Sequence, residues 1–168
     1  MLKELLDNLV VLVDTRDKTN QKILDYFDKH NIKYKMKALK TGDYSFLIQK
    51  CPELGFAMDT YFSDELCIER KNSISELAGN MIEKDERFIK ELNRMINIQD
   101  VYILIENDRF DDIIEHNYRS KYNELSFLRT LLNTQKKSNF YLYFVKDENM
   151  GKVIYEICRS SLMSKILK

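Results

Sequence analysis

Two unbroken runs of uncharged residues constrain the fold of this chain more than any other feature of its sequence. Residues 9–13 read LVVLV and residues 101–105 read VYILI. A strand with one solvated face alternates apolar and polar residues, whereas a strand that is covered on both faces has a continuous apolar run. The two runs therefore predict central strands of a sheet with helices on both sides.

The segments around these runs show helical and strand patterns in turn. Residues 19–30 place apolar side chains at helical spacing, and residues 85–98 place Phe88, Leu92 and Met95 on one apolar helical face. Further helices are expected at 73–81, 109–117, 122–137 and 149–166, and further strands at 32–39, 44–49, 66–69 and 140–145. Residues 51–62 are expected to be irregular.

The order of these elements predicts an α/β fold with a mixed central sheet flanked by helices, because strands cluster first and then alternate with helices. One proline and four glycines leave no linker-like stretch. We therefore expect residues 1–168 to form one domain, with 107–168 completing a core at about 9–106.

The charge balance restricts how the chain could bind nucleic acid. It has 27 basic and 27 acidic side chains, so its formal net charge is zero. Binding to phosphate must then come from a local basic patch. Lys33, Lys35 and Lys37 alternate along the strand expected at 32–39, either as a solvated sheet edge or as a phosphate-contacting face.

The cysteines and the first residues bear on the cellular compartment. Cys51, Cys67 and Cys158 are odd in number and widely spaced, which predicts neither structural zinc nor a disulfide framework. The opening MLKELLDNLVVLVDTR has too short an apolar run for a secretory signal or a membrane span. We expect a cytoplasmic protein with reduced thiols and no membrane partner.

A carboxylate and an amine near residue 70 point to phosphodiester chemistry. Side chains alternate along a strand, so Glu69 and Lys71 share one face. Asp43 follows Gly42 at a turn just before another strand. Two carboxylates supply the hard oxygen ligands that Mg²⁺ prefers, and a lysine can orient water or stabilise developing negative charge.

This pairing of an acidic residue with a lysine two positions later occurs once. Every other lysine lacks an aspartate or glutamate at that spacing. In a chain with 32% charged residues, a single occurrence that follows a strand pattern is moderately specific. We therefore expect a site that binds Mg²⁺ or Mn²⁺ at Asp43 and Glu69.

Three motifs in order resemble the nuclease domain of the XPF-type structure-specific endonucleases, a branch of the restriction-endonuclease-like superfamily. They are Val13-Asp14-Thr15-Arg16, then Gly42-Asp43-Tyr44, then Ile68-Glu69-Arg70-Lys71 followed by SISEL. The family carries V-D-x-R-E, G-D-Y and V/I-E-R-K-x-x-x-D in this order. The resemblance extends from about residue 9 to residue 106.

The resemblance implies a role for each matched position. Asp43 and Glu69 would be metal ligands, together with the backbone carbonyl of Arg70. Asp14 would lie close to the metal, directly or through water. Lys71 would be the catalytic lysine.

The remaining matches include two departures from the family pattern. Arg16, like Arg70, matches an invariant arginine expected to support the carboxylates or to contact phosphate. The family's glutamate after V-D-x-R is Asp17 here. The aspartate four positions after the family's lysine falls on Ser75, and whether Glu76 substitutes for it is left open.

The function that this resemblance implies is metal-dependent endonucleolytic cleavage of DNA, in branched, flapped or forked substrates. One alternative is a DNA-binding or scaffold subunit with an idle nuclease centre. A second is a restriction or junction-resolving nuclease of the same superfamily. The family's tandem helix-hairpin-helix module is not recognised in the sequence, so dimerisation and selectivity for DNA structure stay open.

Several features also have simpler interpretations. Asp14 could cap the helix that follows it. The apolar residues of the final segment, among them Ile154, Ile157 and Met163, could pack on the sheet or bury themselves in a homodimer. His30 and His116 are expected at the surface, outside the site.

Overall fold

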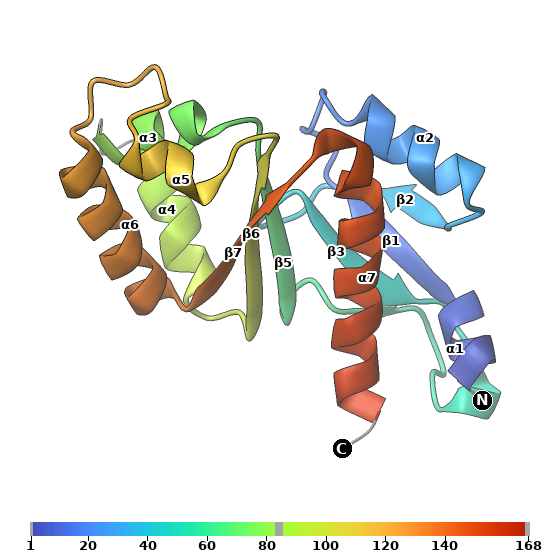
Figure 1. The fold of residues 1–168 in the computed structure, drawn as a ribbon. Helices are drawn as coiled ribbons and strands as arrows, with labels where there is room; N and C mark the ends of the chain where they lie inside the picture. The colour runs from blue at the N-terminus through green and yellow to red at the C-terminus, as the bar shows by residue number, and fades with distance from the viewer. Residues whose placement is uncertain (1, 83–85, 167–168) are drawn as a thin grey trace.

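A twisted mixed sheet forms the centre of the computed structural model, which describes residues 2–82 and 86–166 (Figure 1). Within these residues the sheet has seven strands in the order β2-β1-β3-β5-β6-β7, with β4 also pairing with β3. The strands are β1 (Leu9–Val13), β2 (Tyr34–Met36), β3 (Tyr44–Ile48), β4 (Thr60–Tyr61), β5 (Leu66–Lys71), β6 (Asp100–Glu106) and β7 (Phe140–Val145). Strand β3 is antiparallel to its neighbours, whereas β1–β2, β5–β6 and β6–β7 are parallel.

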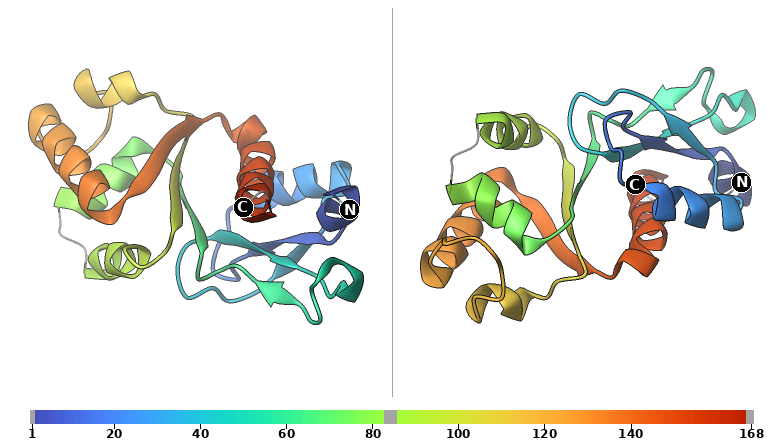
Figure 2. Two further views of the ribbon diagram at one scale, coloured as in Figure 1. Left: turned by 90° about the horizontal axis from the view of Figure 1, so that it is seen from below. Right: turned by 90° about the horizontal axis from the view of Figure 1, so that it is seen from above.

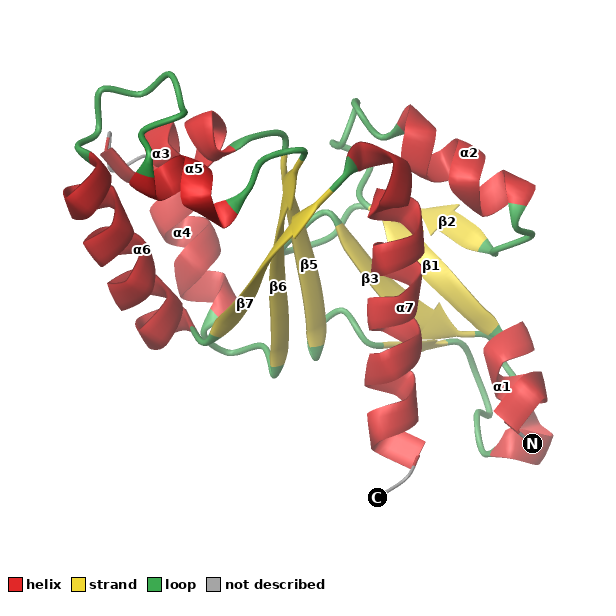
Figure 3. Cartoon of the chain, in the orientation of Figure 1, coloured by secondary structure: helices red, strands yellow, loops and turns green. Residues whose placement is uncertain are grey.

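Helices cover the sheet from two sides (Figures 2 and 3). They are α1 (Leu2–Asp7), α2 (Gln21–Lys29), α3 (Ile74–Ile82), α4 (Glu86–Met95), α5 (Phe110–Ile114), α6 (Glu124–Ser138) and α7 (Asp147–Ile166). Helices α1, α2 and α7 lie on the β1–β3 side, and α3 to α6 gather beside β5–β7. This arrangement confirms the predicted α/β class with a mixed sheet and flanking helices.

Both apolar runs are buried, and the run in β6 is buried for the predicted reason. In β6, Val101, Ile103 and Ile105 face the core formed with α3 to α6. Leu104 faces the opposite core, which contains residues of α2 and α7. Because both faces of this strand are covered by apolar layers, a continuous apolar run is stable there and polar alternation is not.

Helix α7 packs tightly against α2. A Cβ atom on Gly151 would lie 2.9 Å from Tyr26, so a glycine is needed for the two helices to approach this closely. The apolar side of α7 faces the sheet, with Ile154 at 0% exposure and Ile157 at 8%. Packing on the sheet is confirmed, and the prediction that Ile154 and Ile157 form dimer contacts is wrong, because the chain's own core uses them. A homodimer formed through other surfaces stays a prediction.

The predicted elements differ from the observed ones mainly at the ends and at the sheet edge. The strand expected at 32–39 shortens to β2, and residues 51–62 contain a 3₁₀ turn (Pro52–Leu54) and β4. The sequence pattern missed α1, whose Leu5 is buried in the core. Asp85, in the helix expected at 85–98, lies outside the described residues. No helix in the described ranges is long and apolar enough to cross a membrane.

Candidate active site

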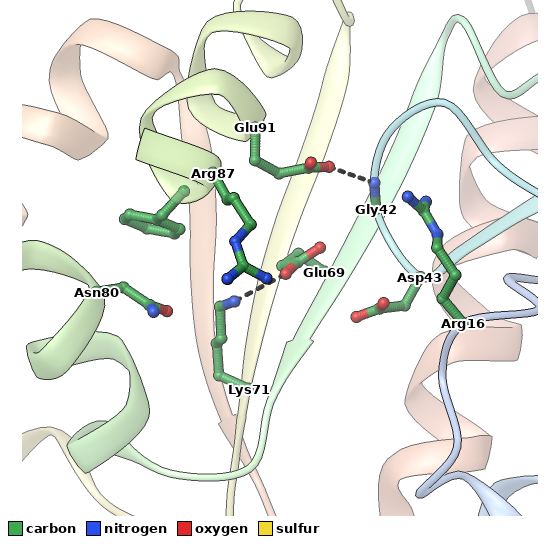
Figure 4. Close-up of a pocket in the computed structure, with 9 residues that line it drawn as sticks. Arg16, Gly42, Asp43, Glu69, Lys71, Asn80, Arg87 and Glu91 are labelled. Atoms are coloured by element: carbon green, nitrogen blue, oxygen red, sulfur yellow. Dashed lines mark hydrogen bonds and ion pairs between the residues drawn. The ribbon is translucent and has the colours of Figure 1, made fainter. Parts of the chain in front are cut away.

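Mostly polar residues from the sheet, its loops and one helical layer line a cavity of about 200 Å³ (Figure 4). Strand β5, the turn before β3, the loop after β1 and helices α3 and α4 each contribute to it. The lining residues are Arg16, Gly42, Asp43, Glu69, Lys71, Asn80, Arg87, Phe88 and Glu91. The structure thus brings Asp43, Glu69 and Lys71 together, and adds neighbours that the motifs did not include.

Strand β5 presents Glu69 and Lys71 to the cavity on one face. Both residues are less than a tenth exposed. Cys67, two residues earlier, belongs to the core on the side of α3 and α4, whereas Ile68 belongs to the opposite core. The predicted alternation along this strand is confirmed, because each second side chain points into the same layer.

The turn at Gly42-Asp43 is held from two strands. The N–H of Asp43 donates to the carbonyl of Ile68 in β5 at 2.8 Å, and its carbonyl accepts from the N–H of Asp14 at 2.8 Å. Its carboxylate Oδ2 accepts from the N–H of Arg70 at 2.8 Å. Asp43 is therefore fixed relative to both β1 and β5 by hydrogen bonds to the main chain.

Only glycine fits at position 42 without strain. Its φ is +73°, in the left-handed region that residues with a side chain rarely adopt. A Cβ atom there would lie 2.5 Å from Cys67 Sγ and 3.0 Å from the carbonyl oxygen of Ile68. The close approach of this turn to β5 is what carries Asp43 to Glu69.

Burial and neighbouring carboxylates raise the affinity of Asp43 and of Glu69 for a positive charge. Burial, and then the repulsion of Glu69, raise the pKa of Asp43 from 3.8 to about 8. Burial also raises the pKa of Glu69, although the attraction of Lys71 opposes it. A proton or a cation between these groups relieves the repulsion, so the site favours binding a cation.

Lys71 is held among acidic and aromatic groups. Its Nζ lies 2.9 Å from Glu69 Oε1 and 3.5 Å from Glu76 Oε1. It also lies 5.3 Å from the centre of the Phe88 ring. Burial alone would lower the pKa of Lys71, but the attraction of Glu69 and a hydrogen bond to it outweigh burial and raise the pKa. Lys71 therefore stays charged at neutral pH.

Asp14 lies behind the cavity and does not line it. It is 1% exposed, and its carboxylate accepts from the N–H of Leu39 at 2.7 Å and from the N–H and guanidinium of Arg16 at 2.8–3.0 Å. Burial alone would raise its pKa, but these hydrogen bonds together lower it. Asp14 also does not cap α2, which begins after Asn20, so a role close to a metal stays a prediction.

Arg70 and Asp17 form a buried pair on the opposite face of β5. The guanidinium of Arg70 lies 3.1 Å from Asp17 and 2.7 Å from Glu106. Asp17 also accepts from the hydroxyl of Tyr44 at 2.7 Å. These contacts join the loop after β1 to β5 and β6, so the Arg70 side chain supports carboxylates and is not exposed to bind phosphate.

The predicted lysine face lies on the edge strand, outside the cavity lining. Lys33 donates to the carbonyl of Asp7 at 2.7 Å and to Gln49 at 3.2 Å. Lys35 pairs in register with Leu12 of β1 and is exposed. Lys37 Nζ lies 4.8 Å from the centre of the Tyr61 ring. Of the three, Lys33 has its amine hydrogen-bonded within the protein.

Helices α3 and α4 contribute residues that sequence analysis did not assign to the site. Asn80 and Glu91 line the cavity, and Glu76 in the first turn of α3 contacts Lys71. Ser75 turns away and accepts from the N–H of Arg119. The helical pattern placed Phe88 on a buried face. Nothing in the sequence around Phe88 shows which strand this helical face covers.

The oxygen ligands that the cavity offers determine which metal ion it could bind. Within the described ranges, no group of three or more His, Cys, Asp or Glu side chains is arranged to hold a metal ion. The candidate ligands are therefore the carboxylates of Asp43 and Glu69 with nearby main-chain oxygens. Mg²⁺ commonly uses one or two carboxylates and keeps several waters, so these residues fit a hydrated Mg²⁺ or Mn²⁺.

Comparisons with known proteins bear on the family and the fold of this chain. The sequence pattern that defines the ERCC4 domain matches residues 13–156. The fold is similar to XPF from Aeropyrum pernix, with a TM-score of 0.64 and 20% identity over 94% of this chain and 68% of that one. It is also similar to XPF from Aeropyrum pernix in complex with DNA, with a TM-score of 0.64 and 21% identity over 92% of this chain and 66% of that one. No curated protein matches the sequence.

Proposed function

Because this chain belongs to the ERCC4 domain family, we propose that it is a DNA endonuclease that depends on a divalent metal. The resemblance to an XPF-type nuclease domain, inferred from three motifs, is confirmed by the family match and the shared fold. One of the two similar structures contains DNA. DNA is therefore the proposed substrate class, with branched, flapped or forked DNA as the preferred form.

The observation that carries the proposal is the convergence of two carboxylates and one amine in a single cavity. Asp43 comes from the turn before β3, and Glu69 and Lys71 come from β5. Figure 4 shows these side chains turned toward the same space. Carboxylates that repel each other beside a charged lysine are suited to hold a cation and a phosphate together.

The side chains around the cavity have separate roles in hydrolysis. Water adds to the scissile phosphorus and one P–O bond of the diester breaks, leaving a phosphate monoester and a hydroxyl. A bound Mg²⁺ would supply positive charge to the phosphate and make the attacking water more acidic. Asp43 and Glu69 would hold the ion, and Lys71 would orient the water or donate to a phosphate oxygen.

Arg16 extends the site toward the backbone of the substrate. Its side chain is 67% exposed, although its guanidinium is oriented by Asp14. An arginine held in this way loses little conformational freedom when it binds phosphate. We assign it to a phosphate next to the scissile bond.

Two other functions stay open at this site. An idle scaffold subunit would keep the fold without the chemistry, and a restriction or junction-resolving nuclease would act on a different DNA. The joint presence of Asp43, Glu69 and Lys71 favours an active nuclease over the scaffold.

A cleavage assay tests these alternatives together. Duplex, flap, fork and four-way-junction DNA are incubated with Mg²⁺, Mn²⁺ or excess chelator. We expect cleavage only with metal, and its loss in Asp43→Asn but not in Asp64→Asn, which changes an exposed aspartate outside the cavity lining. Cleavage in chelator contradicts the metal dependence, and no cleavage of any substrate favours the scaffold subunit.

A further inference from the structure

A side chain of helix α4 contacts the turn that carries Asp43. Glu91 Oε1 accepts a hydrogen bond from the N–H of Gly42 at 2.8 Å, across 49 residues of sequence. Figure 4 shows this contact between α4 and the turn, with the Arg16 side chain beside Gly42. We propose that Glu91 is a positioning residue that holds the Gly42-Asp43 turn and thereby sets the site's affinity for a divalent cation.

Glu91 bonds to the turn from the helical layer, whereas the other main-chain hydrogen bonds of the turn come from the sheet. The main chain of Asp43 is bonded to β5 and to the residue after β1, both within the sheet. Among the described residues, the N–H of Gly42 is bonded to the carboxylate of Glu91 in the helical layer. Gly42 is buried, so removal of this acceptor leaves a buried donor without its protein partner, which is costly.

Glu91 is itself held in place for this contact. Its second oxygen pairs with Arg94 one helical turn later, and its side chain is only 18% exposed. The carboxylate lines the same cavity as Asp43 and Glu69. A hydrogen bond to a charged acceptor is stronger than one between neutral groups, so Glu91 restrains the turn more firmly than a neutral acceptor would.

The consequence for the site follows from the position of Asp43 directly after Gly42. A turn that is released on its helical side can move away from β5, and the distance between the Asp43 and Glu69 carboxylates then varies. Partners that orient metal ligands typically change metal affinity by about 10–100-fold when they are removed. The inference rests on the proposed function, because it treats Asp43 and Glu69 as ligands.

Two variants separate the hydrogen bond from the charge. Glu91→Gln keeps an oxygen acceptor and removes the charge, whereas Glu91→Ala removes both. Glu86→Ala is the matched control, because Glu86 lies on the same helix with a side chain that is 88% exposed. Urea unfolding establishes that each variant is folded before it is compared.

Two readouts that do not require cleavage are measured. One is the amide proton shift and exchange rate of Gly42 by NMR, and the other is Mn²⁺ affinity by calorimetry. In Glu91→Ala we expect an upfield Gly42 amide, faster exchange and Mn²⁺ affinity lower by about tenfold or more. Glu91→Gln is expected to keep the slow exchange and to stay within about threefold of the wild-type affinity, and Glu86→Ala to match the wild type.

Two outcomes would overturn the inference. Unchanged Gly42 exchange and Mn²⁺ affinity in Glu91→Ala would show that the contact positions nothing. Equal loss of Mn²⁺ affinity in both variants, with the Gly42 amide of Glu91→Gln still protected, would show that Glu91 acts through its charge or as a ligand. Failure of the proposed function gives a different result, because the wild-type protein would then bind no Mn²⁺. In that case the Gly42 exchange rate alone would show whether Glu91 restrains the turn.

Discussion

The main-chain N–H of Arg70 donates to the carboxylate of Asp43 at 2.8 Å, which joins two motifs that are 27 residues apart. The bond orients the Asp43 side chain from β5 itself, the strand that carries Glu69 and Lys71. The two motifs therefore act as one structural unit, and a change in either alters the same cavity.

Asp43→Asn should remove metal binding and change how stability depends on pH. The pKa of Asp43 is raised from 3.8 to about 8 in the folded protein. Between these values the folded state keeps a proton that the unfolded state has lost, so metal-free wild-type protein becomes less stable as pH rises from about 4 to about 8. Asparagine does not titrate, so the variant does not lose stability in this way. We expect its free energy of unfolding at pH 8 to exceed that of the wild type by roughly 1–3 kcal/mol.

Urea unfolding in chelator at pH 5 and pH 8 measures this effect. The amide oxygen of asparagine can still accept from the N–H of Arg70, so the fold should persist. Asp64→Asn serves as the control. A pH slope that is the same in Asp43→Asn and in the wild type would contradict the assignment of the shifted group.

Lys71→Met should reduce cleavage without weakening metal binding. Loss of the amine removes a charge that stabilises the reacting phosphate, and we expect a decrease of about 10²–10³-fold in kcat. Mn²⁺ affinity should hold or increase, because Lys71 lies 2.9 Å from Glu69 and competes with a cation for it. Single-turnover cleavage and calorimetry measure the two quantities.

The same variant tests the buried ion pair. Removal of one partner leaves Glu69 buried without its cation and should cost about 3 kcal/mol in metal-free protein. Lys71→Met combined with Glu69→Gln should recover part of this loss. If the double variant is no more stable than the single one, the pair does not contribute to stability.

Lys35→Ala combined with Lys37→Ala tests the basic edge strand. If these amines contact DNA phosphates, the pair should lower DNA affinity and reduce the slope of log K against log salt by about 2. The rate at saturating DNA should change little. Lys33→Ala is the comparison, because the amine of Lys33 is bonded to Asp7 and Gln49. An unchanged salt slope in the double variant would identify the strand as a solvated edge.

Gly42→Ala should destabilise the turn in two ways. The φ of +73° disfavours any side chain, and the new Cβ would meet Cys67 Sγ at 2.5 Å. We expect a loss of about 2–4 kcal/mol in urea unfolding. Cys67→Ala in the same chain removes the clash with Sγ but not the backbone strain, so it should restore part of the lost stability. Full restoration would show that the backbone conformation is not strained.

Ile157→Glu should unfold the protein and not dissociate a dimer through α7. Ile157 is 8% exposed and packs in the core beside the sheet. A carboxylate there would be buried among apolar side chains, and we expect a loss of more than about 3 kcal/mol. Lys152→Glu, on the exposed side of the same helix, is the control. Native-like stability of Ile157→Glu with a change in mass by light scattering would favour the dimer interface instead.

The sequence alone was sufficient to predict the central sheet and the side chains that β5 presents to the site. A run such as residues 101–105 is continuous in apolar character, and side chains alternate along any strand, so burial on two faces and the pairing of Glu69 with Lys71 follow from local geometry. The motif order also predicted that Asp43 approaches β5. Burial and alternation depend on neighbours within a few residues, which the sequence states directly, whereas the approach of Asp43 to β5 was implied by the family resemblance.

The tertiary structure decided the contacts between distant elements. Glu91 accepts a hydrogen bond from Gly42, and Glu76, not Ser75, contacts Lys71. The carboxylate of Asp14 is bonded to Arg16 and does not line the cavity. The periodicity of a helix shows which of its faces is apolar but not which strand that face covers. Such contacts depend on how whole layers pack. For the same reason an apolar α7 could suggest a dimer in the sequence, and only its burial against the sheet showed that the chain itself covers that face.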